Sequence, residues 1–297
     1  MAEPSRFERV TLRNGTRAIR ELESGEVMHP SVGPWAEARA LYVEQSRLAD
    51  RLSAEGSEPV VVWDVGLGGA ANAAAALSCA AEVAATGRSR RPLELVSFER
   101  DLQPLALSLE DPEGFPFLVP FAEAARTLLR DGRWESIESG AQVRWTLHAG
   151  DVREAWRGLG LGLNGDALKP EVVFFDPFSP ETNTALWTPE TFTELRALMR
   201  EDGPGSLLLT YSASTRTRVS MLLGGLYVGV GMPIGGKRET TLAATRRELL
   251  EQPLDARWLE RWRRSSARAP WGRDEAAGSS SEEDARITAH PQFAHAS

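Results

Sequence analysis

The chain has 297 residues, which is enough for one large α/β domain with additions or for two small domains. Its formal net charge of −8 at pH 7 argues against a broad basic surface that coats nucleic acid, although it leaves room for a local basic patch. The single cysteine, Cys79, excludes an internal disulfide bond. Residues 1–20 contain no apolar stretch, and no run approaches the roughly 18 apolar residues of a membrane span, so we expect a cytoplasmic protein.

Strand-like apolar runs alternate with helical patterns through most of the chain. Such alternation predicts a largely parallel sheet that is covered by helices on both faces. The last two runs are joined by only a loop, so they must pair antiparallel. We therefore expect an α/β fold with a mostly parallel, seven-stranded sheet that has one antiparallel strand. The expected strands are residues 60–65, 93–98, 143–148, 172–175, 206–211, 226–230 and 240–244.

The remaining segments suggest how the chain is organised around this sheet. We expect residues 1–57 to form an N-terminal extension that contributes to the cofactor or substrate pocket. The main domain is expected over residues 58–245, with an insertion at about 101–140. Residues 246–266 have the pattern of one charged helix. Residues 267–297 are rich in Ser, Glu and Ala, so we expect a disordered tail.

A glycine-rich turn follows the first expected strand, in the run Asp64-Val65-Gly66-Leu67-Gly68-Gly69-Ala70. Glycines at Gly66 and Gly68 let the backbone turn sharply and approach a ligand with no Cβ in the way. The run resembles the D-x-G-x-G-x-G loop of S-adenosylmethionine binders, with Ala70 in place of the last glycine. We place Asp64, Gly66, Gly68 and Asn72 beside the cofactor. A nicotinamide dinucleotide could use the same loop, and an ordinary turn of an α/β sheet is the other alternative.

Acidic residues stand at the ends of the next two expected strands. Glu99 directly follows Leu95-Val96-Ser97-Phe98, where a carboxylate can accept hydrogen bonds from both ribose hydroxyls of an adenosine. Gly150-Asp151 closes the third strand, and Asp151 could accept a hydrogen bond from the adenine amino group. A surface glutamate and a helix N-cap are the respective alternatives.

The most specific run is Asp176-Pro177-Phe178-Ser179-Pro180, at the end of the fourth expected strand. A carboxylate held at this edge of the sheet can orient the lone pair of an amine and stabilise the developing ammonium. We assign Asp176, Pro177 and Phe178 to the reaction centre and Tyr211 to the acceptor pocket. An Asp-Pro turn and a tyrosine at the edge of the core are the alternatives.

With these motifs the chain resembles the methyltransferases that complete 5-methylaminomethyl-2-thiouridine at the tRNA wobble position, the MnmC-like family. The family's Asp-x-Phe-x-Pro turn corresponds to residues 176–180 and is followed here by Leu186-Trp187. Its late Gly-x-Lys-Arg-Glu element corresponds to Gly236-Lys237-Arg238-Glu239. Its N-terminal Ser-Gly-Glu stretch corresponds to Ser24-Gly25-Glu26, and Glu37 matches the acidic residue that follows.

The resemblance implies a Rossmann-like methyltransferase that takes its methyl group from S-adenosylmethionine and transfers it to an aminomethyl nitrogen in tRNA. It adds Glu37 to the cofactor site, and Lys237 and Arg238 to the substrate site. Phosphate contacts would come from a basic patch, for which the candidates are Lys237, Arg238, Arg216, Arg218, Arg246, Arg247, Arg261, Arg263 and Arg264.

Three alternatives remain open at this stage: a methyltransferase for another amine, an NAD-dependent oxidoreductase, and a binding module that has lost catalysis. The sequence predicts no metal site, because His29 and His148 are far apart in the chain and the other two histidines lie in the tail.

Overall fold

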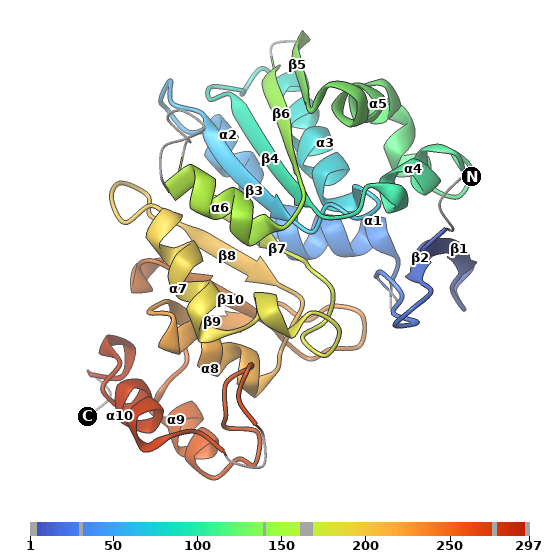
Figure 1. The fold of residues 1–297 in the computed structure, drawn as a ribbon. Coiled ribbons are helices and arrows are strands. Elements are labelled where there is room, and N and C mark those ends of the chain that lie inside the picture. The colour runs from blue at the N-terminus through green and yellow to red at the C-terminus, as the bar shows by residue number, and fades with distance from the viewer. Residues whose placement is uncertain (1–4, 30–31, 139–140, 161–168, 275–277, 295–297) are drawn as a thin grey trace.

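The computed structural model describes residues 5–29, 32–138, 141–160, 169–274 and 278–294. Their centre is an eight-stranded sheet with the order β5-β6-β4-β3-β7-β8-β10-β9 (Figure 1). Its strands are β3 (Val60–Val65), β4 (Leu93–Glu99), β5 (Arg133–Glu138), β6 (Ala141–Ala149), β7 (Val172–Phe175), β8 (Leu207–Thr210), β9 (Tyr227–Gly231) and β10 (Thr240–Ala244). The α/β, mostly parallel arrangement expected from the sequence is confirmed, and all seven expected strands are present.

The expected count of seven strands, with one antiparallel, is wrong. The eighth strand, β5, lies at the end of the expected insertion and pairs antiparallel with β6, while β10 is antiparallel to both β8 and β9. Residues 133–138 read Arg-Trp-Glu-Ser-Ile-Glu, in which the two apolar residues are isolated and fall on opposite faces of the strand. Trp134 is partly buried, whereas Arg133, Glu135 and Ile137 are exposed on the other face, as suits an edge strand.

Helices cover both faces of the sheet, and consecutive residues of β3 pack into two different cores. Val60 and Val62 contact the core beneath α3, whereas Val61 and Trp63 contact the core beneath α6, α7 and α8. Figure 1 shows α6 and α7 in front of the sheet and α3 behind it. These helices span Ala71–Ala85 (α3), Val152–Gly160 (α6), Pro189–Leu198 (α7) and Thr215–Leu223 (α8). The insertion before β5 adds α4 (Gln103–Leu109), the 3-10 helix η2 (Pro116–Phe121) and α5 (Ala122–Asp131).

The N-terminal extension has its own small elements. β1 (Phe7–Thr11) and β2 (Arg17–Glu21) form an antiparallel hairpin. A short helix α1 (Pro34–Glu37) continues into the π-helical segment η1 (Ala38–Glu44), which packs on α3 and buries Leu41 and Tyr42, and α2 (Leu48–Ser53) follows. The extension is thereby attached to the face of the main sheet.

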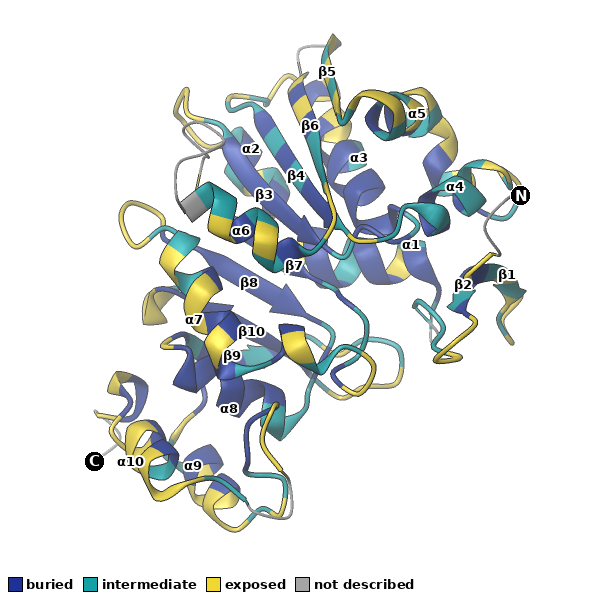
Figure 2. Cartoon of the chain, viewed as in Figure 1, coloured by how far each residue is buried: buried dark blue, intermediate teal, exposed yellow. Residues whose placement is uncertain are grey.

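The expectation of a disordered tail from residue 267 is wrong for the described part of that segment. After α9 (Ala256–Arg263), the chain forms α10 (Ser281–Thr288), which begins with a capping box between Ser280 and Glu283. Figure 2 shows α9 and α10 buried on one side and exposed on the other. The buried side includes Trp258, Trp262 and Ile287. Sparse but well-placed apolar residues are therefore enough to dock this polar segment.

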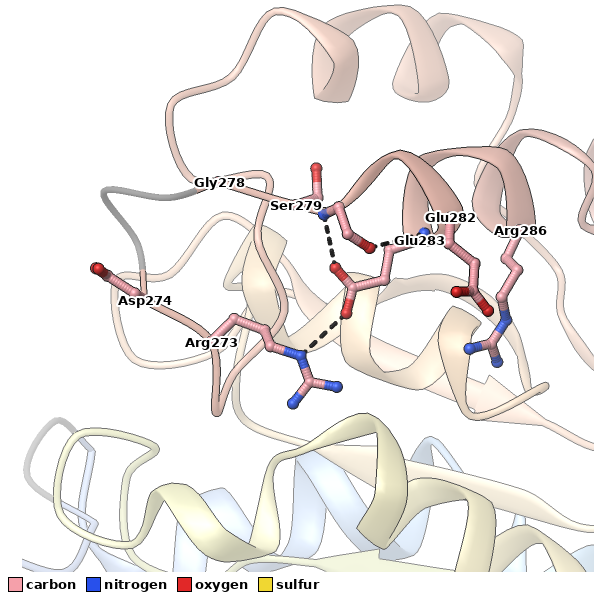
Figure 3. A pocket seen from close by; sticks show the side chains of 8 residues that line it. Arg273, Asp274, Gly278, Ser279, Glu282, Glu283 and Arg286 are labelled. Carbon is pink, nitrogen blue, oxygen red and sulfur yellow. Dashed lines mark hydrogen bonds and ion pairs between the residues drawn. The ribbon is translucent and has the colours of Figure 1, made fainter.

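A cavity of about 470 Å³ lies within this C-terminal segment (Figure 3). Glu283 fills its wall, where it accepts hydrogen bonds from Arg273 Nε at 3.1 Å and from the backbone N–H of Ser280 at 2.9 Å. These contacts link the chain on either side of Gly278. Within the described ranges, no helix is long and apolar enough to cross a bilayer.

Candidate active site

A cavity of about 690 Å³ lies at the carboxyl ends of β3, β4, β6 and β7. Parallel strands end together at this edge, which is where α/β sheets place their ligands. The sheet contributes Gly66, Gly68, Glu99, Asp151 and Asp176 to the lining. The N-terminal extension contributes a second wall, from Phe7, Glu21, Glu26, Met28, His29 and Glu37.

The glycine turn after β3 has a shape that side chains would prevent. Gly66 has a φ of 93°, and a Cβ added there would lie 2.5 Å from the carbonyl oxygen of Asp176. Gly68 has a φ of 50° and lies against the sulfur of Met28. Ala70 also has a positive φ, 64°, and is the N-cap of α3. Glycine at position 66 therefore allows close contact between two turns: the glycine turn after β3 and the turn after β7 that contains Asp176.

Glu99 links the second strand to the glycine turn. Its Oε2 accepts a hydrogen bond from the backbone N–H of Gly68 at 2.9 Å, and its Oε1 accepts one from the N–H of Asp101 at 2.9 Å. Burial raises the pKa of this carboxyl, and the backbone hydrogen bonds oppose the shift. Two oriented carboxylate oxygens at the cavity surface form an acceptor pair that suits a vicinal diol such as a ribose.

Asp151 both caps a helix and lines the cavity, so the two alternatives expected from the sequence are compatible. Its Oδ1 accepts a hydrogen bond from the backbone N–H of Arg153 at 2.8 Å, as a helix cap does, and the same residue lines the cavity next to Gly150. The Arg153 guanidinium lies 2.9 Å from Oδ2, and its hydrogen bonds hold the pKa of Asp151 below the ordinary value.

Asp176 lies at the centre of a polar cluster, and only 9% of its side chain is exposed. Asn72 Nδ2 donates a hydrogen bond to its Oδ2 at 2.8 Å, so these two predicted residues are together. Burial raises the pKa of Asp176 to about 6. His29 Nε2 lies 3.8 Å from the same oxygen, and His29 Nδ1 lies 3.7 Å from Glu37 Oε1. His29 was not among the residues predicted from the sequence.

Asp64 lies beneath this cluster and is fully buried. Its Oδ2 accepts a hydrogen bond from Ser97 Oγ at 2.9 Å, and Trp145 Nε1 donates to that hydroxyl at 2.9 Å. Burial raises the pKa of Asp64 to about 7. Among the residues that the structure describes, Asp64 Oδ1, Asn72 Oδ1 and the Tyr42 hydroxyl are buried polar atoms without a hydrogen-bond partner. These atoms surround Asp176 from behind the cavity wall, and the Tyr42 hydroxyl faces the Asp176 carboxylate, which lines the cavity.

The predicted acceptor side of the pocket is formed around Tyr211. Its hydroxyl donates to the carbonyl of Pro177 at 3.1 Å, and the ammonium of Lys237 lies 4.6 Å from its ring centroid. Trp187 Nε1 donates to the carbonyl of Phe178 at 3.0 Å, which ties the Leu-Trp pair to the Asp-Pro-Phe turn. Arg238 is exposed and, unlike Lys237 and Tyr211, is not among the residues that line the cavity.

Two arginines of the candidate basic patch have internal partners instead. Arg216 lies over the ring of Trp271 at 4.2 Å and donates to backbone carbonyls of the C-terminal segment. Arg218 is buried, 2.9 Å from Glu239, and donates to the carbonyl of Thr240. Both side chains hold the fold together, so they are removed from the patch. No group of three or more metal-ligating side chains occurs within the described part of the chain.

The donor set fits the methyl donor that the sequence implies. Glu99 and Asp151 line the cavity, where they could accept hydrogen bonds from a ribose and an adenine. Asp64 and Asn72 do not line it: both are buried behind the wall, and Asn72 reaches the cavity through its hydrogen bond to Asp176. The glycine turn between them leaves backbone, rather than side chains, against the ligand.

Comparison with known proteins agrees with this reading. Residues 123–246 match the model of a family described as S-adenosyl-L-methionine-dependent methyltransferase. The chain is 27% identical to the tRNA 5-methylaminomethyl-2-thiouridine biosynthesis bifunctional protein MnmC of Aeromonas hydrophila, over 80% of this chain and 35% of that protein. It is 30% identical to the protein of the same name from Cupriavidus necator, over 50% of this chain and 22% of the relative. The chain thus spans about a third or less of the length of these relatives.

The crystal structure of MnmC2 from Aquifex aeolicus is similar over 96% of this chain and 85% of that one, with a TM-score of 0.69 and 25% sequence identity. The Rossmann-like fold expected from the sequence is therefore confirmed, and the family match identifies the cofactor as S-adenosylmethionine rather than a nicotinamide dinucleotide. The chain is an S-adenosylmethionine-dependent methyltransferase that is similar to part of the bifunctional MnmC proteins.

Proposed function

We propose that this enzyme is an N-methyltransferase that methylates the aminomethyl group of a modified wobble uridine in tRNA. The observation that carries the proposal is the buried carboxylate of Asp176, which lies on the cavity wall and is oriented by Asn72. Bound S-adenosylmethionine supplies a methyl group on a positively charged sulfonium. The acceptor atom must then bring a lone pair, and a carboxylate beside it favours an amine that becomes positively charged as it reacts.

The assignment of roles to the cavity residues follows from their places around Asp176. Glu37, Asp64, Gly66, Gly68, Asn72, Glu99, Gly150 and Asp151 are proposed to hold the cofactor, and Asp176 contacts both the cofactor and the acceptor. Pro177 and Phe178 shape the turn at the reaction centre. Tyr211 and Lys237 are proposed to line the acceptor side, where they lie in contact.

The proposal of tRNA as partner rests on the names of the relatives and on the charge around the cavity. The MnmC relatives are named for the biosynthesis of a tRNA nucleoside with a 5-methylaminomethyl group. Arg100 and Lys237 line the cavity and are exposed, so an anionic backbone has two cationic groups to approach, whereas Arg153 is paired with Asp151. The other charged residues of the lining are acidic and suit the amine rather than the backbone. An enzyme with this substrate would work in the cytoplasm, where tRNA is modified.

The test is methyl transfer to tRNA from cells that lack the gene. The wild-type enzyme with S-adenosylmethionine should convert the aminomethyl nucleoside to the methylaminomethyl nucleoside, as measured by mass spectrometry of digested tRNA. Asp176→Asn should lose about 10²-fold or more in kcat while binding S-adenosylmethionine within a few-fold of wild type. If the tRNA is unchanged but a small primary amine is methylated, the acceptor is another amine and the tRNA part of the proposal is wrong.

A further inference from the structure

His29 lies on the cavity wall between carboxylates from two different elements. Its Nε2 is 3.8 Å from Asp176 Oδ2, in the turn after β7, and its Nδ1 is 3.7 Å from Glu37 Oε1, in α1. The side chain is 13% exposed and lines the cavity. The residue also has a φ of 52°, a left-handed conformation that only a few per cent of non-glycine residues adopt. Such strained positions are concentrated at functional sites.

The groups that face this imidazole are mostly acidic. Glu37 approaches from α1, Asp176 from the turn after β7, and Asp64 from the end of β3, while the Tyr42 hydroxyl of η1 lies near Asp176. Burial lowers the pKa of His29, but the interaction with Glu37 and the negative charges of Asp176 and Asp64 outweigh it, so the pKa is raised. The imidazole is therefore well placed to take up and hold a proton.

We propose that His29 is the acceptor, through Asp176, of the proton that the substrate ammonium must lose before methyl transfer; this inference rests on the proposed function. The ammonium gives one proton to the Asp176 carboxylate, and the proton then passes to Nε2 of the neutral imidazole. Because Oδ2 and Nε2 are 3.8 Å apart, this second transfer takes place through one water molecule or after the two side chains approach each other. The amine lone pair then forms the new N–C bond while the C–S bond of the sulfonium breaks and its electron pair stays on sulfur. The product is a secondary ammonium, and the imidazolium releases its proton to water in the cavity.

Glu37 has a separate part in this arrangement. Its carboxylate lies beside Nδ1, so it holds the imidazole from the side opposite Asp176 and stabilises the imidazolium that forms when Nε2 takes up a proton. Asn72 orients the other member of the pair, because its amide donates a hydrogen bond to the Asp176 oxygen that His29 faces. Glu37 and Asn72 are thus positioning residues for the His29–Asp176 pair.

The test compares the pH profiles of the wild type and His29→Asn. Asparagine tolerates a left-handed backbone and does not titrate, so the loop conformation should survive. We expect kcat to fall about 10²-fold at pH 7. The deficit should shrink as the pH approaches the pKa of the substrate amine, because an amine that arrives neutral needs no proton acceptor. His29→Gln should behave in the same way, and calorimetry should give S-adenosylmethionine affinities within a few-fold of wild type.

His290→Asn is the matched control, since His290 caps the backbone N–H of Gln292 in the C-terminal segment and asparagine can do the same. It should keep the wild-type activity and profile. A deficit of His29→Asn that is equal at every pH, or one that follows a loss of cofactor affinity, would overturn the role of His29. A wild type that leaves the tRNA amine unmethylated would instead overturn the proposed function and the proton transfer with it.

A second measurement does not depend on any acceptor. Histidine titration by NMR should show the His29 imidazole titrating above the ordinary value, and both Glu37→Gln and Asp176→Asn should lower its pKa. A His29 titration that neither substitution moves means that the imidazole is not coupled to these carboxylates, and the inference is then wrong.

Discussion

Glu26 and Ser179, which are 153 positions apart in the sequence, are joined by two hydrogen bonds: the Ser179 backbone N–H donates to Glu26 Oε1 and its hydroxyl to Oε2, both at 2.8 Å. The Thr182 hydroxyl donates to the same carboxylate. The N-terminal extension is thereby fastened to the turn that contains Asp176. Residues before the sheet therefore help to fix the geometry of the reaction centre.

Glu26→Ala should loosen the turn that contains Asp176 without abolishing cofactor binding. We expect kcat to fall about 10-fold and the free energy of unfolding to drop by about 1–2 kcal/mol, because hydrogen bonds to a charged group are lost at a partly buried position. Urea unfolding and single-turnover methylation measure the two effects. Glu23→Ala changes an exposed glutamate of the same loop and should leave both quantities at wild-type values. Equal behaviour of the two variants would mean that the Glu26 contacts contribute nothing to the turn.

Glu99→Gln should weaken cofactor binding more than it weakens the fold. The amide has only one oxygen, so it cannot accept from two ribose hydroxyls and from the Gly68 and Asp101 N–H groups as the carboxylate can. We expect the Kd for S-adenosylmethionine, measured by calorimetry, to rise about 10- to 100-fold.

Glu94→Gln is the control for this substitution. Glu94 lies on the same strand, β4, and pairs with Arg144 at 3.0 Å, away from the cavity lining. The Kd of the Glu94→Gln variant for S-adenosylmethionine should match that of the wild type. An unchanged Kd for Glu99→Gln would remove Glu99 from the cofactor site.

The residues that the sequence could predict are those whose chemistry is local to one strand end. Each of Asp64, Glu99, Asp151 and Asp176 directly ends or follows an apolar run, and parallel strands bring such ends to one edge. His29 has no such signal, because it is a single histidine in a loop. Only the packing of the N-terminal extension on the sheet brings it to Asp176.

The errors in the predicted fold have a related cause. β5 has single apolar residues between polar ones, which a search for apolar runs passes over. The composition of the C-terminal segment predicts disorder, whereas Ser280 and Glu283 have the spacing of a capping box and mark a helix start. Composition averages over a segment, whereas docking depends on a few side chains such as Trp271 and Phe293, which are buried.

Asp64→Asn should change how stability depends on pH. Burial raises the pKa of Asp64 to about 7 from an ordinary 3.8, so the folded state keeps a proton that the unfolded state releases. The stabilisation from that proton is present at low pH and is lost as the pH rises through about 7. Asparagine does not titrate, so the variant should gain about 2–4 kcal/mol of unfolding free energy relative to wild type between pH 4 and pH 8.

Urea unfolding at several pH values measures this relative gain. Asp50→Asn, at an exposed aspartate in α2, is the control and should follow the wild-type curve. If the difference in unfolding free energy between Asp64→Asn and wild type is constant with pH, Asp64 is ionised in the folded protein throughout that range and its pKa is not raised.

The Gln292 side chain makes hydrogen bonds to the backbone of β9, the last strand of the sheet. Its Oε1 accepts from the N–H of Val228 at 2.7 Å, and its Nε2 donates to the carbonyls of Val228 at 2.7 Å and Leu254 at 2.9 Å. Gln292→Ala removes the side-chain partners of the buried Val228 N–H and of the Leu254 carbonyl, whereas the Val228 carbonyl keeps the Leu254 N–H, so we expect the free energy of unfolding to fall by about 1–3 kcal/mol. Gln142→Ala, at an exposed position of β6, should cost less than about 0.5 kcal/mol. Because Gln292 is far from the cavity lining, cofactor affinity should be retained in both variants. A loss as small as that of Gln142→Ala would show that β9 does not need the C-terminal segment to cover its edge.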